Sequence, residues 1–288
     1  MGPPLVGLAA VCWGLSGGIG GALLADGWSA LLLALCRGSV GLLFALLWFG
    51  LRRESGGLGN LRLWLWSVIA GLGVAGNFTF YFFSIGEGSV AVAATLMYCA
   101  PIYVFLTAFA LGKEASTPSK WGAIALAMVG IALLTGVDDP GSGGTTFLGI
   151  VSGLLSGLCY AVFIFAFRFA GNHGSPQATL LIAFAVLVIL LAGPTPASQT
   201  TAVLTTPDWP LFLALGVLGA GLSFLLFVVG MRHTKPTVAS MIALLEPVTA
   251  VLFGVALLDE ALDGSQLVGL VLVLSTATAL GVRSGAHA

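Results

Sequence analysis

Charged side chains are scarce in this sequence of 288 residues, and their scarcity excludes an ordinary soluble protein. Asp, Glu, Lys and Arg make up 7% of the chain, whereas about 25% is usual in a soluble domain. A soluble fold of this length could not cover its surface with so few charges. The net charge of −1 also provides no basic surface for nucleic acid. With 58% hydrophobic residues, the composition predicts an integral membrane protein whose partner is the lipid bilayer.

Cysteine and histidine are also few, and neither occurs in a pattern that supports chemistry. The four cysteines lie in apolar stretches without disulfide or metal-ligand spacing, and the three histidines lie in predicted loops or in the C-terminal tail. The stretch from Gly14 to Gly18 fits the G-x-S-x-G pattern, but Ser16 has no histidine at its depth to act as a base. No Walker A motif is present. We therefore expect no catalytic residue, no metal, no cofactor and no enzyme activity.

The sequence is rich in apolar stretches of about 20 residues, the length that spans a bilayer. Ten such spans are predicted, separated by short connections that carry Gly, Pro, Asp and Ser. Their ranges are 5–25, 29–50, 63–85, 89–111, 119–136, 147–170, 177–193, 209–231, 237–257 and 265–283. No basic segment precedes the first span, so we expect it to remain in the protein and not to be removed as a signal peptide.

One stretch occurs twice. Residues 89–115 (SVAVAATLMYCAPIYVFLTAFALGKEA) and residues 235–261 (KPTVASMIALLEPVTAVLFGVALLDEA) align without a gap, and Pro101 falls on Pro247. Apolar sequence of low complexity can match itself by chance. The paired mid-span prolines and the gap-free register favour a duplicated half.

The duplication predicts an all-α integral membrane protein with ten transmembrane helices. The first half is expected at residues 1–137, a linker at 138–146 and the second half at 147–288. Because five spans per half is an odd number, the second half enters the membrane from the opposite side. Two halves of opposite orientation form an inverted-topology repeat, which is a common construction of secondary transporters.

The basic residues give the orientation. With the N-terminus in the cytoplasm, nine of the ten Lys and Arg residues lie on the cytoplasmic side, and the tenth is Arg37. Eight of the eleven acidic residues fall on the opposite side: Asp26, Glu87, Asp138, Asp139, Asp208, Asp259, Glu260 and Asp263. The positive-inside rule therefore places both termini in the cytoplasm and predicts a multi-pass protein of the cytoplasmic (inner) membrane.

Two charged residues lie deep within predicted spans, Arg37 in the second and Glu246 in the ninth. A charge at that depth costs several kcal/mol unless it is paired or hydrated. Each residue could face a water-accessible cavity and bind or couple transport. Alternatively, the two could form a buried ion pair, or could hydrogen-bond to backbone and lock the helices together.

The mid-span prolines Pro101 and Pro247 each remove a helical hydrogen bond and leave carbonyl groups free near the middle of the membrane. They predict a hinge or a carbonyl-lined site, because such discontinuous helices form the sites of transporters. A simple packing kink is the alternative, since kinks are common in membrane helices.

Polar and aromatic side chains gather at the same depth in several spans. An Asn side chain in hydrocarbon must meet a partner or a cavity, and aromatic side chains can either line that cavity or pack in the core. Together with Glu246, we predict a substrate-binding set at mid-depth, comprising Trp13, Asn77, Phe78, Tyr81, Tyr98, Tyr160, Ser223 and Phe227.

The chain resembles a known family in several features. They are the ten predicted helices, the five-helix repeat, Trp13-Gly14 in the first helix, Arg37 in the second, and mid-span prolines with Glu114 and Glu260 closing the fourth and ninth spans. These features are similar to those of the drug/metabolite transporter superfamily, EamA type. Its length, short loops and aromatic mid-membrane helices look most like the YddG-type aromatic amino-acid exporters.

The resemblance implies a secondary transporter that works by alternating access and carries small molecules out across the cytoplasmic membrane. Among the family's substrates, amino acids with aromatic or large neutral side chains suit the predicted aromatic wall, and we expect a monomer. Two alternatives remain open at this point. One is a broad exporter of drugs or other metabolites through the same cavity, and the other is a channel-like facilitator.

Overall fold

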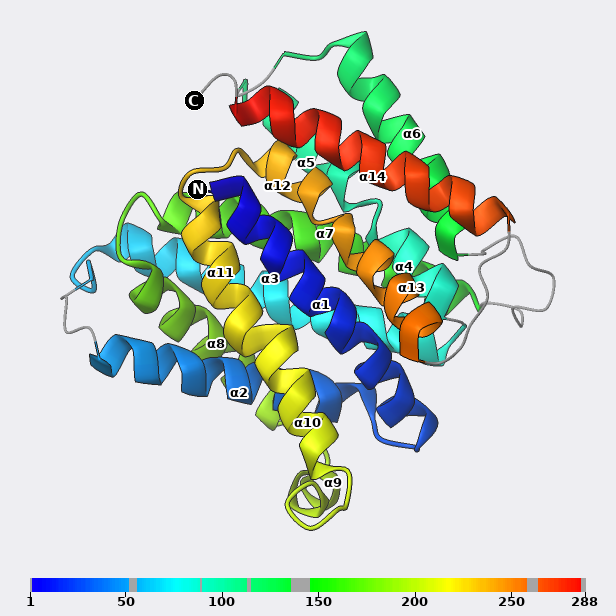
Figure 1. Ribbon diagram of the computed structural model, residues 1–288. Coiled ribbons are helices and arrows are strands. Elements are labelled where there is room, and N and C mark those ends of the chain that lie inside the picture. The colour runs from blue at the N-terminus through cyan, green and yellow to red at the C-terminus, as the bar shows by residue number, and fades with distance from the viewer. Residues whose placement is uncertain are drawn as a thin grey trace.

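The computed structural model describes residues 2–51, 56–88, 90–112, 115–135, 146–257 and 264–285 (Figure 1). Within these ranges the regular structure is helical throughout, and no strand occurs. The prediction of an all-α chain built from apolar helices is confirmed for this part of the protein. Glu114 and Glu260, which the repeat pairs with one another, lie outside the described residues.

The helices follow one another with short connections. They are α1 (Gly2–Ala25), α2 (Ala30–Leu51), α3 (Leu61–Gly86), α4 (Val90–Met97), α5 (Ala100–Ala110), α6 (Pro118–Thr135), α7 (Phe147–Ala170), α8 (Pro176–Ala192), α9 (Ala197–Ala202), α10 (Trp209–Gly216), the π-helix η1 (Val217–Gly221), α11 (Leu222–Met231), α12 (Pro236–Ile242), α13 (Leu245–Leu257) and α14 (Gly264–Gly285).

Six helical segments of the described chain are long and apolar enough to cross a membrane. Four further apolar helices are shorter: Pro118–Leu134, Pro176–Ala192, Pro236–Ala250 and Gly264–Thr276. All ten lie at predicted spans. The short helix α9 lies in the connection after α8, where the sequence predicted only a loop.

The fourth and ninth spans are interrupted, each by a two-residue break. α4 ends at Met97 and α5 starts at Ala100, whereas α12 ends at Ile242 and α13 starts at Leu245. The ring of a proline clashes with the carbonyl of the residue four positions earlier, which is Met97 for Pro101 and Ala243 for Pro247. Each proline therefore stands in the first turn of the second helix, where its missing N–H needs no partner. The sequence predicted one apolar span around each proline, at 89–111 and 237–257, with a hinge or a carbonyl-lined site at its middle; the structure has two shorter helices in each place.

The eighth span is also irregular. α10 and α11 are joined by η1, a single π-helical turn with two glycines among its five residues. Such turns widen a helix by one residue and leave backbone carbonyls turned away from their usual partners.

The helices pack in pairs. α3 lies along α7, and α1 lies along both α11 and α13, so these helices occupy the middle of the molecule (Figure 1). α2 packs on α8 at one side, and α6 packs on α14 at the other. Glycines allow the closest approaches: a Cβ at Gly14 of α1 would overlap the Glu246 carbonyl of α13.

The connections gather at two ends of the helix bundle. At the end that contains the start of α1, Ser175 N–H donates to the Gly56 carbonyl at 2.8 Å, and Arg232 donates to the Gly174 carbonyl at 2.6 Å. The described charges at this end are basic and belong to Arg62, Lys120, Arg168, Arg232 and Lys235.

The other end carries acidic residues. Thr146 donates to the Glu87 carboxylate at 2.9 Å, and the Trp28 indole N–H donates to the Asp208 carboxylate at 3.2 Å. The described charges of the chain are therefore sorted by sign between the two ends.

Candidate functional site

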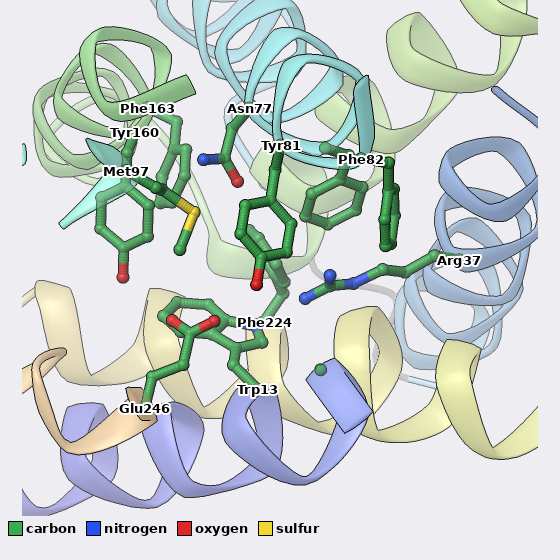
Figure 2. Close-up of a pocket in the computed structure, with 12 residues that line it drawn as sticks. Trp13, Arg37, Asn77, Tyr81, Phe82, Met97, Tyr160, Phe163, Phe224 and Glu246 are labelled. Carbon is green, nitrogen blue, oxygen red and sulfur yellow. The ribbon is translucent and has the colours of Figure 1, made fainter. Parts of the chain in front are cut away.

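A small cavity lies at mid-depth, where α1, α2, α3, α4, α7, α11 and α13 converge (Figure 2). Its volume is about 20 Å³, which is room for roughly one water molecule. The residues that line this central cavity are Trp13, Gly17, Arg37, Asn77, Phe78, Tyr81, Phe82, Met97, Tyr160, Phe163, Phe224 and Glu246.

Trp13 is the centre of an aromatic cluster. Its ring centroid lies 5.1 Å from those of Phe224 and Phe227, 6.1 Å from that of Tyr160 and 6.4 Å from that of Phe163. The ring planes are tilted or edge-on to one another, the arrangement that aromatic quadrupoles favour. Only 2% of the Trp13 surface is exposed. The cluster gives the cavity a rigid apolar wall contributed by α1, α7 and α11.

Arg37 enters the central cavity from the side opposite Glu246 (Figure 2). Its Nε–H donates to the Gly219 carbonyl of η1 at 2.8 Å, and its Cζ atom lies 4.0 Å from the centroid of the Phe78 ring. The Gly219 carbonyl of the π-turn and the aromatic face of Phe78 thus hold this cation in the interior of the helix bundle. Since Nε makes the backbone bond, the outer guanidinium nitrogens remain directed at the cavity, as Figure 2 shows.

Glu246 stands in the first turn of α13, immediately after the break in the ninth span. A carboxylate is favoured there because the helix dipole is positive at its N-terminal end. The Tyr98 side chain lies within hydrogen-bonding reach of this carboxylate. The Oε2 atom, however, is buried without a hydrogen-bond partner.

No ion pair between Arg37 and Glu246 is present among the described residues; Arg37 is held by Gly219 and Phe78 instead. Figure 2 shows the Tyr81 hydroxyl pointing into the space between the two charged groups. The cavity therefore presents a cation and an anion at separate places on its wall. Each can accept a further partner of opposite charge.

Two other polar atoms of the lining also lack a partner, the Trp13 indole N–H and the Tyr160 hydroxyl. Buried polar atoms nearly always have a hydrogen-bond partner, so unsatisfied ones that line a cavity indicate a ligand or ordered water. Together with Glu246 Oε2, they provide two donors and one acceptor around the same space.

Asn77 lines the cavity but is already engaged. Its Nδ2 donates to the Ser156 Oγ at 3.0 Å and to the Ser156 carbonyl at 3.2 Å, while the Ser156 hydroxyl donates to the Asn77 carbonyl at 3.1 Å. Two turns further along the same pair of helices, Ser84 donates to the Gly149 carbonyl at 2.8 Å. These bonds tie α3 to α7.

The structure brings most of the predicted binding set into the lining. Trp13, Asn77, Phe78, Tyr81, Tyr160 and Glu246 border the central cavity, as does Arg37. Three members do not: Tyr98 contacts the site through Glu246, Phe227 is fully buried behind Trp13, and Ser223 is fully buried with its hydroxyl unpartnered.

Five lining residues were absent from the predicted set, namely Gly17, Phe82, Met97, Phe163 and Phe224. Helical spacing could have found three of them, since Gly17 is one turn after Trp13, Phe82 one turn after Phe78, and Phe163 one turn after Tyr160. Phe224 falls on Phe78 when the gap-free register of residues 89–115 and 235–261 is extended toward the N-terminus. Ser16, the serine of the G-x-S-x-G stretch, has a structural role: its hydroxyl donates to the Trp13 carbonyl of the same helix at 2.8 Å.

The fold and the cavity define a class of protein. Apolar helices that span a membrane, two of them broken at mid-depth beside a polar and aromatic cavity, are the construction of a membrane transport protein. A family model supports this class and gives the family: the EamA-like transporter family model matches residues 1–136 and 147–281. The chain belongs to the EamA-like transporter family, within the drug/metabolite transporter superfamily.

Relatives of this chain agree with that assignment. It is 31% identical over 196 residues to an uncharacterized transporter of Archaeoglobus fulgidus, a match that covers 68% of each chain. It is 26% identical over 215 residues to the uncharacterized transporter YxxF of Bacillus subtilis, covering 73% of this chain and 68% of the relative. Protein PecM of Dickeya dadantii is 25% identical over 223 residues, with 74% and 72% covered. The expected EamA family is thus confirmed, and with it a transporter in place of an enzyme.

The fold also matches a known one. A solved crystal structure superposes with a TM-score of 0.76 over 98% of this chain and 98% of that chain, at 20% sequence identity. At this identity the likeness establishes the fold alone.

Proposed function

We propose that the protein is a secondary transporter that exports amino acids, aromatic or large neutral ones in particular, across the cytoplasmic membrane by alternating access. The observation that carries the proposal is the pair of opposite charges in one aromatic-walled cavity. Arg37 and Glu246 are not paired with one another, yet both line the same space. A zwitterion satisfies both charges at once, with its carboxylate on Arg37 and its ammonium group on Glu246.

The remaining lining suits the rest of such a molecule. Trp13, Tyr160 and Phe224 offer aromatic faces and edges to an apolar or aromatic side chain. Tyr81 and Tyr160 offer hydroxyl groups near the charged ends. This combination supports a substrate of the YddG-type exporters, a branch that the chain resembles by its sequence.

The cavity must enlarge to accept this substrate, because about 20 Å³ is far below the volume of an amino acid. The breaks at Tyr98-Cys99 and Ala243-Leu244 lie beside the lining residues Met97 and Glu246 and can act as hinges. We assign Pro101 and Pro247 to these hinges, since each fixes the start of the helix after the break.

Helix packing supports the inverted repeat of five spans in each half. In the predicted repeat, α1 of residues 1–137 corresponds to α7 of residues 147–288, and α3 corresponds to α11. The contact of α3 with α7 therefore has its equivalent in the contact of α11 with α1. α2 corresponds to α8 and α6 to α14, so the α2–α8 and α6–α14 contacts each join two equivalent helices. Two equivalent units related in this way can rock around a central site and open it to each side in turn. The basic end, by the positive-inside rule, faces the cytoplasm of a monomer in the inner membrane.

The first test is uptake of labelled phenylalanine, tryptophan, threonine and a cationic drug into proteoliposomes. We expect saturable amino-acid uptake with mutual competition and with counterflow, in which unlabelled solute inside drives uptake of label. An open channel gives no counterflow, so its absence would contradict the carrier mechanism. Transport of the drug alone would favour the alternative described below.

The binding site is tested by Tyr81→Ala and Tyr98→Ala. Tyr81 lines the cavity and Tyr98 lies within reach of the Glu246 carboxylate, so either loss should lower kcat/KM about tenfold, the effect of one hydrogen bond and one aromatic contact. Tyr103→Ala is a matched control, because Tyr103 lies in α5 and does not line the cavity. Unchanged kinetics in folded Tyr81→Ala protein would contradict this site.

One observation favours a second function, a broad exporter of cationic drugs and metabolites. Glu246 with an unpartnered Oε2 beside Trp13 and Tyr160 is also a suitable site for an organic cation. Such a substrate would leave Arg37 without a role in binding. Competition by chemically unrelated cations, unaffected by Arg37→Gln, would favour this function over amino-acid export.

A further inference from the structure

We infer that Gly17 of α1 sets the size limit of the substrate, because the side chain of the exported amino acid lies over this residue. The inference rests on the proposed export of amino acids and adds the residue that selects among them. Its basis is the open space beside Gly17 in the wall of the central cavity.

The glycines of α1 differ in what an added side chain would meet. A Cβ at Gly14 would overlap the Glu246 carbonyl, and a Cβ at Gly20 would lie 2.9 Å from the Phe82 Cε1 atom. A Cβ at Gly17 would meet no atom within 4 Å, although Gly17 lines the central cavity. Gly14 and Gly20 therefore allow neighbouring groups to pack closely, whereas Gly17 leaves a volume empty.

Aromatic side chains bound this empty volume. Trp13 lies one turn before Gly17 on the same face of α1. Phe82 of α3 lies against Gly20, about one turn after Gly17. Trp13 and Phe82 both line the cavity (Figure 2). The space over Gly17 is thus a gap between two aromatic side chains, which suits the apolar or aromatic side chain of an amino acid.

The corresponding position of the predicted second half is filled. Phe163 of α7 falls on Gly17 when the gap-free register of residues 89–115 and 235–261 is extended toward the N-terminus. Phe163 also lines the cavity, and its ring packs against those of Trp13, Tyr160 and Phe224. The cavity is therefore asymmetric, with a phenyl ring in the wall from α7 and a gap in the wall from α1.

Neither the backbone nor the packing of α1 requires glycine at position 17. The residue lies inside a regular helix, where alanine is more favourable than glycine. Its missing side chain also allows no close helix contact, since a Cβ there meets nothing. What glycine provides at this position is room in the cavity.

Room at this position can distinguish one amino acid from another. Arg37 and Glu246 bind the charged groups that all amino acids share, so they cannot select among side chains. A volume of fixed size can, because one methylene group more or less in a pocket changes kcat/KM by about 10–200-fold. Side-chain volume over Gly17 is therefore the property that ranks the substrates.

The experiment measures counterflow of labelled alanine, threonine, phenylalanine and tryptophan in proteoliposomes of the whole protein. Gly17→Ala should raise the KM for phenylalanine and tryptophan about tenfold and leave that for alanine within about twofold. Gly17→Val should abolish counterflow of the two aromatic amino acids and retain that of alanine. Gly122→Val is the matched control, because a Cβ at Gly122 of α6 also meets nothing within 4 Å and Gly122 does not line the cavity.

Thermal unfolding in detergent separates a size limit from a packing role. Gly17→Ala should keep or raise the Tm, since the added methyl group meets nothing and alanine favours the helix. A lower Tm would assign Gly17 to helix packing and overturn the inference. An equal change in KM for all four amino acids, or no change for any, would also overturn it and leave the proposed function standing.

Failure of the proposed function gives a different result. If the wild-type protein carries cations and no amino acid, amino-acid export is overturned, and the same variants are measured with tetrabutylammonium and tetramethylammonium. Loss of the larger cation alone in Gly17→Val would then support the size limit, and equal loss of both would overturn it. Absence of counterflow for every solute would overturn the proposed function and the inference with it.

Discussion

Two polar residues one turn apart on the same face of α3 differ in what their side chains contact. Asn77 is bound to Ser156 of α7, whereas Tyr81, one turn later, points its hydroxyl into the central cavity. Both are polar residues in the interior of a membrane protein, and both were predicted to bind substrate. The hydrogen bonds distinguish them: the amide of Asn77 has its partners within the protein, so we assign Asn77 to helix packing first.

This assignment predicts the effect of Asn77→Ala. The variant loses the bonds to Ser156, and we expect a loss of about 1 kcal/mol in stability, typical of interhelical hydrogen bonds in membranes. Thermal unfolding in detergent measures it. Ser156→Ala should have a similar effect, and the double variant should be little worse than either single variant, because both remove the same bonds. Additive losses would contradict a shared interaction.

Gly14 also contributes to helix packing, because its lack of a side chain lets two helices approach closely. A Cβ at Gly14 would overlap the Glu246 carbonyl and come within 2.7 Å of the Thr249 Cβ. Gly14 therefore allows α1 to approach the backbone of α13 at the point where Glu246 begins the helix. This close approach brings Trp13, the neighbour of Gly14, and Glu246 to the same cavity.

Among the elements, η1 has the most specific consequence. The π-turn presents the Gly219 carbonyl to Arg37 Nε, and this bond links α2 to the eighth span across 182 positions of sequence. A Cβ at Gly219 would overlap Arg37 Nε and lie 3.0 Å from its Cδ and Cζ atoms. The geometry of the turn therefore decides where the guanidinium group lies.

Gly219→Ala should displace Arg37 from its carbonyl. We expect kcat/KM for the zwitterionic substrate to fall about tenfold, the value of one hydrogen bond to a charged group. Gly122→Ala is the control, because a Cβ at Gly122 of α6 meets nothing within 4 Å. Wild-type kinetics in Gly219→Ala would show that the position of Arg37 does not matter for transport.

The two broken spans differ in their surroundings although their sequences repeat. The break after α4 places Met97 at the cavity, while the break after α12 places Glu246 there. The predicted half 147–288 therefore provides the acidic group, Glu246, and α2 of the predicted half 1–137 provides Arg37. If the halves rock, the two charges separate or approach, which suits a site that must release its substrate.

At the scale of the whole molecule, hydrogen bonds between connections close both ends of the bundle. At the basic end, Arg168 of α7 donates to the carbonyls of Met231 and Arg232 at the end of α11, and Arg232 donates to Gly174. These bonds join segments that belong to the second predicted half. The N-terminal residue of α1 lies against the same region, since a Cβ at Gly2 would overlap Thr234 and Gly230.

Arg168→Ala should loosen this end. In a background without the four native cysteines, we expect faster labelling of a cysteine at the cavity position Gly17 by a thiol reagent applied from the basic side. The reason is that two carbonyls at the end of α11 lose their donor. Labelling from the acidic side provides the control. Equal labelling rates in the variant and its parent would contradict a closing role for Arg168.

Much of the architecture could be predicted from the sequence because its causes are local. Apolar length places the helices in a membrane, and prolines and glycines mark their ends. The prolines at 101 and 247 correctly indicated that the fourth and ninth spans are irregular. The sequence could not indicate the two-residue breaks, which depend on how the chain relieves the clash of each proline with its preceding turn.

The candidate site could be predicted only in part. Depth along a span is readable from sequence, so Trp13, Tyr81, Tyr160 and Glu246 were expected at a similar depth, and all four line the cavity. The direction of a side chain around its helix is much harder to read when nearly all residues are apolar. Phe227 was therefore predicted at the site but lies behind Trp13, and Phe224 was not predicted but lines the cavity.

The sequence by itself determined the membrane class, the helical segments, the sorting of charges between two ends and the resemblance to a transporter family. Each of these depends on composition or on residues close together in the chain. Only the tertiary structure decided that Arg37 binds Gly219 instead of Glu246, that Asn77 is satisfied by Ser156, and that Glu246 Oε2 is unpartnered. These depend on which helix faces meet, and in an apolar bundle small residues and a π-turn set those contacts, which no local pattern encodes.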